Sequence, residues 1–84
     1  MHFQFSTLIK ADSRVKEFNF TKPSSLSMNI FHVDVVDNWD NRISFRMQKQ
    51  GEQQWEVVES QLPKWIYEVE GKLNEAIEEQ LCIV

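Results

Sequence analysis

The sequence predicts an α+β fold, an antiparallel five-stranded β-meander followed by one C-terminal amphipathic helix packed on one sheet face, forming a two-layer sandwich. Apolar side chains alternate with period two along the first two thirds of the chain, as in half-buried strands. Near residue 62 the spacing changes to i, i+3, i+4, i+7, which indicates a helix. Short turns separate the alternating runs, so neighbouring strands are expected to pair in chain order. Because the apolar sheet face and the helix stripe both need burial, we expect the helix to lie across the sheet.

Five alternating runs predict the strands, which we place at about 3–10, 15–21, 28–36, 42–49 and 54–58. Asp12 and Ser13 are expected to form a two-residue loop between the first two strands, which sets Phe5 opposite Phe20. Pro23 lies in a predicted loop, because proline interrupts a strand. A dense run of turn-forming residues over 37–41 predicts a second hairpin.

The last third predicts one helix over about residues 62–81, with its apolar stripe formed by Leu62, Trp65, Ile66, Val69, Leu73, Ala76, Ile77 and Leu81. Ser60 is expected to cap this helix, and Pro63 suits its first turn, where the missing N–H has no partner to lose. Gly71 falls almost opposite the stripe, where glycine lowers helix stability by about 1 kcal/mol relative to alanine. It can serve a close approach of a partner backbone, allow a slight bend of the helix, or simply be tolerated. Ile83 and Val84 would extend the stripe beyond the sheet.

Length and charge set the size and the partner classes. The 84 residues form a single predicted domain, 1–84, with 42% apolar residues and a net charge of −4. A chain of this size buries about 60–65% of its unfolded surface, so a partner subunit would add stability. An acidic chain does not attract nucleic acid or an anionic membrane over its whole surface.

Several functional classes lack their sequence signatures. Cys82 is the single cysteine, so a disulfide or a cysteine zinc site within one chain is excluded. We see neither a secretory signal nor a membrane-spanning apolar run, and three residues from Cys82 onward are one too few for a prenylation box. A cytoplasmic location is therefore expected, without membrane contact. With two glycines, no phosphate loop, no nucleophile elbow and no recognisable carboxylate pair, we expect no enzyme activity, cofactor or metal.

The polar face of the sheet carries three of the candidate binding residues, His32, Arg42 and Arg46. His32 shares this face with Asp34, and with Glu56 two strands away they suggest a metal or general-base site. A metal needs further ligands, so we favour a solvated histidine. A cross-strand ladder Asp34–Arg46–Glu56, contributing about 0.2–1 kcal/mol per pair, is the favoured role of Arg46. A register shift by two residues would free Arg46 for binding.

Trp39 is the fourth candidate binding residue. It falls in the predicted turn at 37–41, where a large exposed aromatic ring would offer a contact surface. We favour the alternative that it folds back over the end of the sheet. Trp55 and Trp65 have simple core positions, one on the inward strand face and one on the helix stripe.

These features favour a small non-catalytic protein-interaction or scaffold module, expected to be a homodimer formed by helix or sheet-edge contact, with an unknown protein partner. The alternative is binding of single-stranded nucleic acid. The order meander then helix is similar in topology to the Whirly and coactivator-type single-strand binders, although the chain matches no motif of theirs. That resemblance implies binding across the outer sheet face, with Trp39 as a stacking platform. The supporting basic residues would be Lys10, Lys16, Arg42, Arg46 and Lys49.

Overall fold

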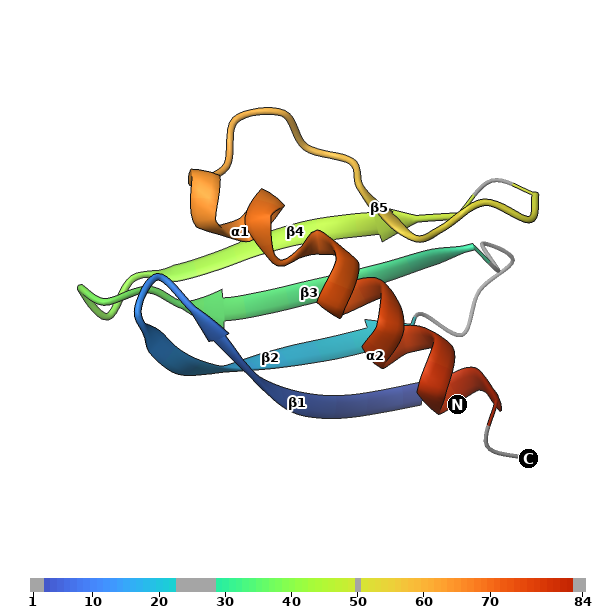
Figure 1. The fold of residues 1–84 in the computed structure, drawn as a ribbon, viewed down its shortest axis with the longest axis horizontal. Coiled ribbons are helices and arrows are strands. Elements are labelled where there is room, and N and C mark those ends of the chain that lie inside the picture. Colours follow the sequence, from blue (N-terminus) through green and yellow to red (C-terminus); the bar gives the residue numbers. More distant parts are fainter. Residues whose placement is uncertain (1–2, 23–28, 50, 83–84) are drawn as a thin grey trace.

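The structure, a computed structural model, describes residues 3–22, 29–49 and 51–82. Within these ranges the elements are β1 (Phe3–Ala11), β2 (Arg14–Lys22), β3 (Ile30–Val36), β4 (Arg42–Gln48), β5 (Glu56–Val57), α1 (Lys64–Glu68) and α2 (Glu70–Cys82). The strands pair antiparallel in chain order, and the helices cross one face of the curled sheet (Figure 1). The predicted α+β meander followed by a C-terminal helix is confirmed.

The β1–β2 hairpin has the predicted turn and register. Asp12 and Ser13 have φ values of 53° and 69°, the left-handed pair of a type I′ turn, whose twist suits two antiparallel strands. Phe5 lies opposite Phe20, and their rings stack with centroids 4.5 Å apart. The short turn therefore sets which side chains of β1 and β2 share the apolar face.

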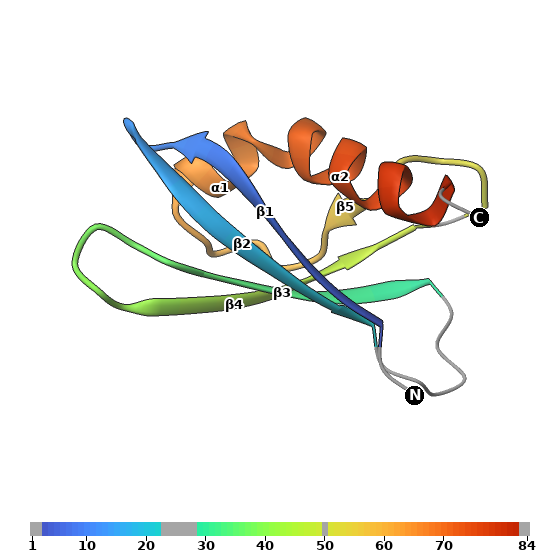
Figure 2. The ribbon, with the colours of Figure 1, turned by 90° about the horizontal axis from the view of Figure 1, so that it is seen from below.

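The sheet curls where the two hairpins meet. The pairing of β2 with β3 runs only from Asn19–Asp34 to Thr21–His32. Beyond Asn19 the β1–β2 hairpin rises away from β3 and β4 toward the helices, as Figure 2 shows. The sheet thus forms a half-barrel with its concave side under α1 and α2.

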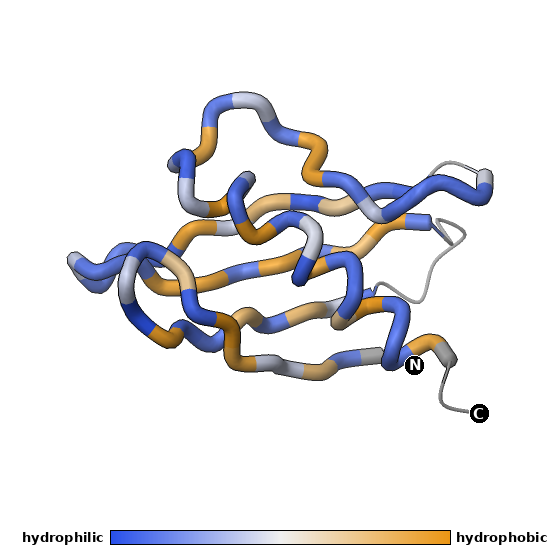
Figure 3. The backbone as a smooth tube through the Cα atoms, in the orientation of Figure 1, coloured by the Kyte–Doolittle hydropathy of each residue, from blue (hydrophilic) through white to orange (hydrophobic). Residues whose placement is uncertain are grey.

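The core fills this concave side. Phe31 is at its centre, in edge-to-face contact with Phe20 at 6.4 Å and with Trp55 at 5.1 Å between ring centroids. Hydrophobic and hydrophilic residues alternate along the strands in Figure 3, which matches the period-two pattern. The other buried apolar residues are Ile9, Ala11, Phe18, Val33, Val35, Phe45, Met47, Ile66, Val69, Leu73 and Ile77.

The C-terminal helix differs from the prediction in continuity and in its cap. It divides at Val69, whose N–H bonds to the carbonyl of Ile66 at 3.2 Å, the i to i−3 pattern that tightens a last turn. Ser60 is not the cap, because α1 follows directly on Pro63 and has no side-chain cap bond. Gly71 is exposed as predicted, and a Cβ there would meet no atom within 4 Å.

Two further expectations concern the ends of elements. The fifth strand, Glu56–Val57, is shorter than the predicted 54–58. The loop at Pro23, the start of the third strand at 28, and Ile83 with Val84 lie outside the described residues.

Candidate functional site

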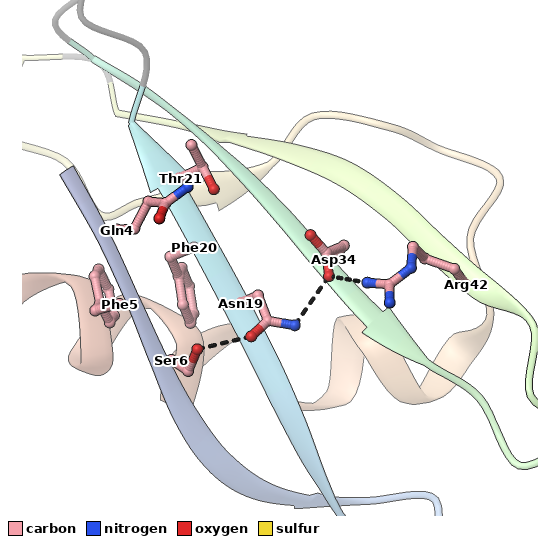
Figure 4. A pocket seen from close by; sticks show the side chains of 8 residues that line it. All are labelled: Gln4, Phe5, Ser6, Asn19, Phe20, Thr21, Asp34 and Arg42. Atoms are coloured by element: carbon pink, nitrogen blue, oxygen red, sulfur yellow. Dashed lines mark hydrogen bonds and ion pairs between the residues drawn. The ribbon is translucent and has the colours of Figure 1, made fainter. Parts of the chain in front are cut away.

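A chain of polar side chains crosses the sheet on the face away from the helices. The Ser6 hydroxyl donates to Asn19 Oδ1 at 2.7 Å, and Asn19 Nδ2 donates to Asp34 Oδ1 at 3.0 Å. Arg42 Nη1 reaches the same Asp34 oxygen at 2.5 Å (Figure 4). The four side chains come from β1, β2, β3 and β4, and they border an open hollow of about 530 Å³. Four of its lining side chains, Ser6, Asn19, Asp34 and Arg42, therefore already bond to one another.

The predicted ladder Asp34–Arg46–Glu56 is wrong, because the β3–β4 register differs by two residues. Asp34 faces Ser44, and His32 faces Arg46. The shift does not free Arg46, because Glu59, beyond β5, binds it twice. Glu59 Oε2 accepts from Arg46 Nε at 2.9 Å, and Oε1 accepts from the Arg46 backbone N–H at 2.9 Å.

The Glu59 carboxylate takes the place of a strand neighbour for β4. Burial alone would raise the pKa of Glu59, but the backbone N–H and guanidinium of Arg46 outweigh burial, and the pKa is lowered. The Tyr67 hydroxyl donates to the Glu59 carbonyl at 2.5 Å, which anchors this connection to α1. Sequence reasoning missed Glu59, although it directly follows the predicted fifth strand.

His32 is exposed on β3. Among the described residues, no three His, Cys, Asp or Glu side chains gather closely enough to hold a metal ion. Glu56 lies on β5 opposite Gln48, so the hypothesis joining it to His32 and Asp34 has no geometric support.

Trp39 projects from the loop between β3 and β4 and is 82% exposed. The expectation that it folds back over the sheet is therefore wrong. Asp37 Oδ1 accepts the backbone N–H groups of Trp39 and Asn41, both at 2.8 Å. The bond from Asn41 is the main cause that lowers the pKa of Asp37. The loop thus holds the backbone of Trp39 in place while its ring faces solvent.

Lys16 joins the two hairpin tips. Its side chain is only 7% exposed, and its ammonium donates to Asn38 Oδ1. Asn38 Nδ2 donates in turn to Asp12 Oδ2 at 3.0 Å, and Lys16 Nζ lies 5.1 Å from the ring centroid of Trp65. Lysine at an inward position of the second predicted strand was the available signal for this role.

Large apolar side chains are exposed on the outer side of the first hairpin. Leu8 on β1 is 69% exposed and Val15 on β2 is 65% exposed. Both occupy positions that the alternation assigns to the polar face, and that mismatch was the signal missed in the sequence. The other exposed large apolar residues are Val36, Trp39, Val58 and Leu81.

The two edges of the sheet are treated differently. At β5, the Trp55 N–H donates to Asn74 Oδ1 at 2.8 Å and the Val57 N–H donates to Glu70 Oε2 at 2.7 Å. Side chains of α2 therefore occupy that edge. β1 is the opposite edge, and it runs for nine residues.

The chain matches no family model, no curated protein and no solved structure in the comparisons made. Its candidate site is thus defined by geometry alone. No helix in the described part of the chain is long and apolar enough to cross a membrane.

Proposed function

We propose that the protein is a small non-catalytic protein-interaction module that works as a homodimer. The long edge of β1 carries this proposal. An edge strand presents unpaired N–H and C=O groups that bind another strand, and monomeric proteins blunt such edges with charges, proline or short strands. β1 has nine residues, no proline, and Lys10 as its single charge.

The polar groups support a non-catalytic role. The two carboxylates with a lowered pKa, Asp37 and Glu59, both accept backbone N–H groups that close a loop or an edge. A catalytic site usually gathers perturbed groups around one hollow. Here the perturbation is explained by structural hydrogen bonds, and neither group borders the hollow that Asp34 and Arg42 line.

Sedimentation equilibrium from low to high micromolar concentration tests the proposal. We expect the mass to rise to twice the 10.0 kDa of one chain. A mass that stays at one chain over the whole range would overturn the homodimer. A cytoplasmic location and a further protein partner remain predictions.

Single-stranded nucleic-acid binding is the second candidate, favoured by the exposed ring of Trp39. Most of its supporting cations are engaged, since Arg42, Arg46 and Lys49 form ion pairs and Lys16 is buried. Paired cations gain less from phosphate contact, because breaking the existing pair offsets the released counterions. Oligonucleotide titration at low salt, with Trp39→Ala as the comparison, tests this candidate. Absence of binding by the unmodified protein eliminates it.

A further inference from the structure

We propose that the second copy binds along β1, so that the two β1 strands pair antiparallel about a two-fold axis and join the two sheets into one. This inference rests on the proposed homodimer and names its interface. It is carried by the direction of the backbone groups of β1, by the closure of the opposite edge, and by the side chains that the pairing brings together.

The backbone pattern follows from the type I′ turn. In a two-residue hairpin the residues that flank the turn, Ala11 and Arg14, form a hydrogen-bonded pair, and such pairs recur at every second residue. The alternate residues of β1 direct their N–H and C=O groups away from β2. These residues are Gln4, Ser6, Leu8 and Lys10, and all four have exposed side chains.

No helix or strand of the described part of the chain covers the outer side of β1. Figure 2 views the molecule from this side, and both helices lie beside β1 without passing in front of it. Within the described part of the chain, no bond reaches the outward backbone groups of those four residues. A second strand can therefore approach along the whole element.

Closure at β5 selects the symmetry. If both edges were open, β1 of one copy could pair with β5 of the next, and such head-to-tail contacts would continue into a filament. Asn74 and Glu70 already accept the N–H groups of Trp55 and Val57 at that edge. Two copies are thus left with the β1–β1 contact, which is self-complementary and closes as a dimer.

The register follows from overlap and charge. Outward residues must meet outward residues, which allows pairings centred on Ser6, Thr7 or Leu8. Centring on Thr7 pairs every residue of Phe3–Ala11 with one of the partner strand, whereas the other two registers leave ends unpaired. It also sets Lys10 beside the partner's Gln4, so the two Lys10 side chains lie at opposite ends.

The same register adds an apolar contact. Phe5 is only partly buried in the single chain, where it packs against the core. The pairing places it beside the partner's Ile9 at a non-hydrogen-bonded position, where cross-strand side chains approach most closely. The association therefore gains from backbone pairing and from further burial of Phe5.

A matched pair of charge substitutions tests the interface by sedimentation. Leu8→Lys and Val15→Lys each add a positive charge at an exposed site of the same hairpin, but only Leu8 lies on the edge strand. We expect Leu8→Lys to raise the dimer dissociation constant at least about tenfold. Val15→Lys is expected to leave it within about twofold. Circular dichroism checks that both variants fold.

A proline substitution gives a second measurement. Leu8→Pro removes an N–H that points away from β2, so the hairpin keeps its own bonds while the edge loses a donor. We expect folded protein with a similarly weakened dimer.

Cysteine crosslinking reads the register directly. In a Cys82→Ser background, the register centred on Thr7 predicts a covalent dimer on oxidation of Thr7→Cys, because facing Cα atoms lie within disulfide range. Lys10→Cys is the control, since its two copies lie at opposite ends of the paired strands. A stronger crosslink with Ser6→Cys or Leu8→Cys would overturn this register.

The outcomes separate the two proposals. A wild-type chain that stays monomeric overturns the homodimer and its interface together. A dimer that is insensitive to Leu8→Lys and Leu8→Pro, and that does not crosslink through residues 6, 7 or 8, overturns only the β1 interface.

Discussion

The two edges of this sheet show different ways of managing unpaired backbone. β5 is two residues long, and its outward N–H groups end on side chains of α2. β1 is nine residues long, and no bond from the described part of the chain reaches its outward groups. The edge of a sheet is therefore protected by the side chains that other segments place against it. Strand length and composition alone do not decide the outcome.

Geometry explains why α2 can close the β5 edge. Glu70 and Asn74 are four residues apart on one helix face, a rise of about 6 Å. Trp55 and Val57 are two residues apart in extended backbone, about 6.7 Å. The nearly equal spacings let two successive helix acceptors meet two successive strand donors.

Removing an acceptor at the closed edge should have the largest effect on stability. Asn74→Ala leaves the N–H of Trp55 without its acceptor in a partly buried position, and we expect a loss of about 1–3 kcal/mol in the free energy of unfolding. Urea unfolding followed by circular dichroism measures the loss. Glu75→Ala, at an exposed site of the same helix, is the control and should stay within about 0.5 kcal/mol. Equal effects of the two variants would contradict this role of Asn74.

Removing both acceptors at the β5 edge should change the oligomeric state. In the double variant Glu70→Ala with Asn74→Ala, both edges carry unpaired groups, so β1 can pair with β5 of the next copy. We expect light scattering to show species larger than a dimer. A double variant that folds but remains dimeric would show that another feature protects β5.

Lys16 on β2 should contribute to the free energy of unfolding. Lys16→Met keeps the apolar stem but loses the bond to Asn38 and the contact with the Trp65 ring, and we expect a loss of about 1–2 kcal/mol. Chemical denaturation checks this value. The exposed Lys10→Met should change the free energy of unfolding by less than about 0.5 kcal/mol.

Acid should weaken the Glu59 contact with β4. Because the pKa of Glu59 is lowered in the folded protein, its stabilising contribution is present above its ordinary value of 4.5 and is lost as the pH falls through the lowered pKa. The side chain is partly exposed, so Glu59→Gln should remove only a few tenths of a kcal/mol at neutral pH. Unfolding of both proteins at neutral and acidic pH measures this difference, which should shrink in acid. A constant difference would contradict the assignment.

Hydrogen exchange should show the smallest effect, a difference in exchange rate between the backbone N–H groups of the β1 edge and those of the β5 edge. The N–H groups of Trp55 and Val57 have acceptors in every copy and should exchange slowly at all protein concentrations. Those of Ser6 and Leu8 should exchange quickly in dilute solution and slow down as the dimer forms. Concentration-independent exchange at Ser6 and Leu8, in a protein shown to dimerise, would contradict pairing along β1.

Local chemistry explains the predictions that were confirmed. The alternation over β1 and β2, together with the Asp12–Ser13 turn, determines the pairing of Phe5 with Phe20, because a two-residue loop leaves no freedom in register. The apolar stripe likewise identifies the helical third of the chain, since its period depends only on neighbouring residues.

Other features were decided by tertiary structure. A two-residue shift between β3 and β4 keeps every side chain on its face, so alternation cannot tell which of these registers the 37–41 loop selects. The partner of Arg46, the outward position of Trp39 and the acceptors of the β5 edge depend on where distant segments return. Sequence alone therefore determined the elements and their apolar faces, while the chain's three-dimensional path decided which polar groups meet and which sheet edge α2 closes.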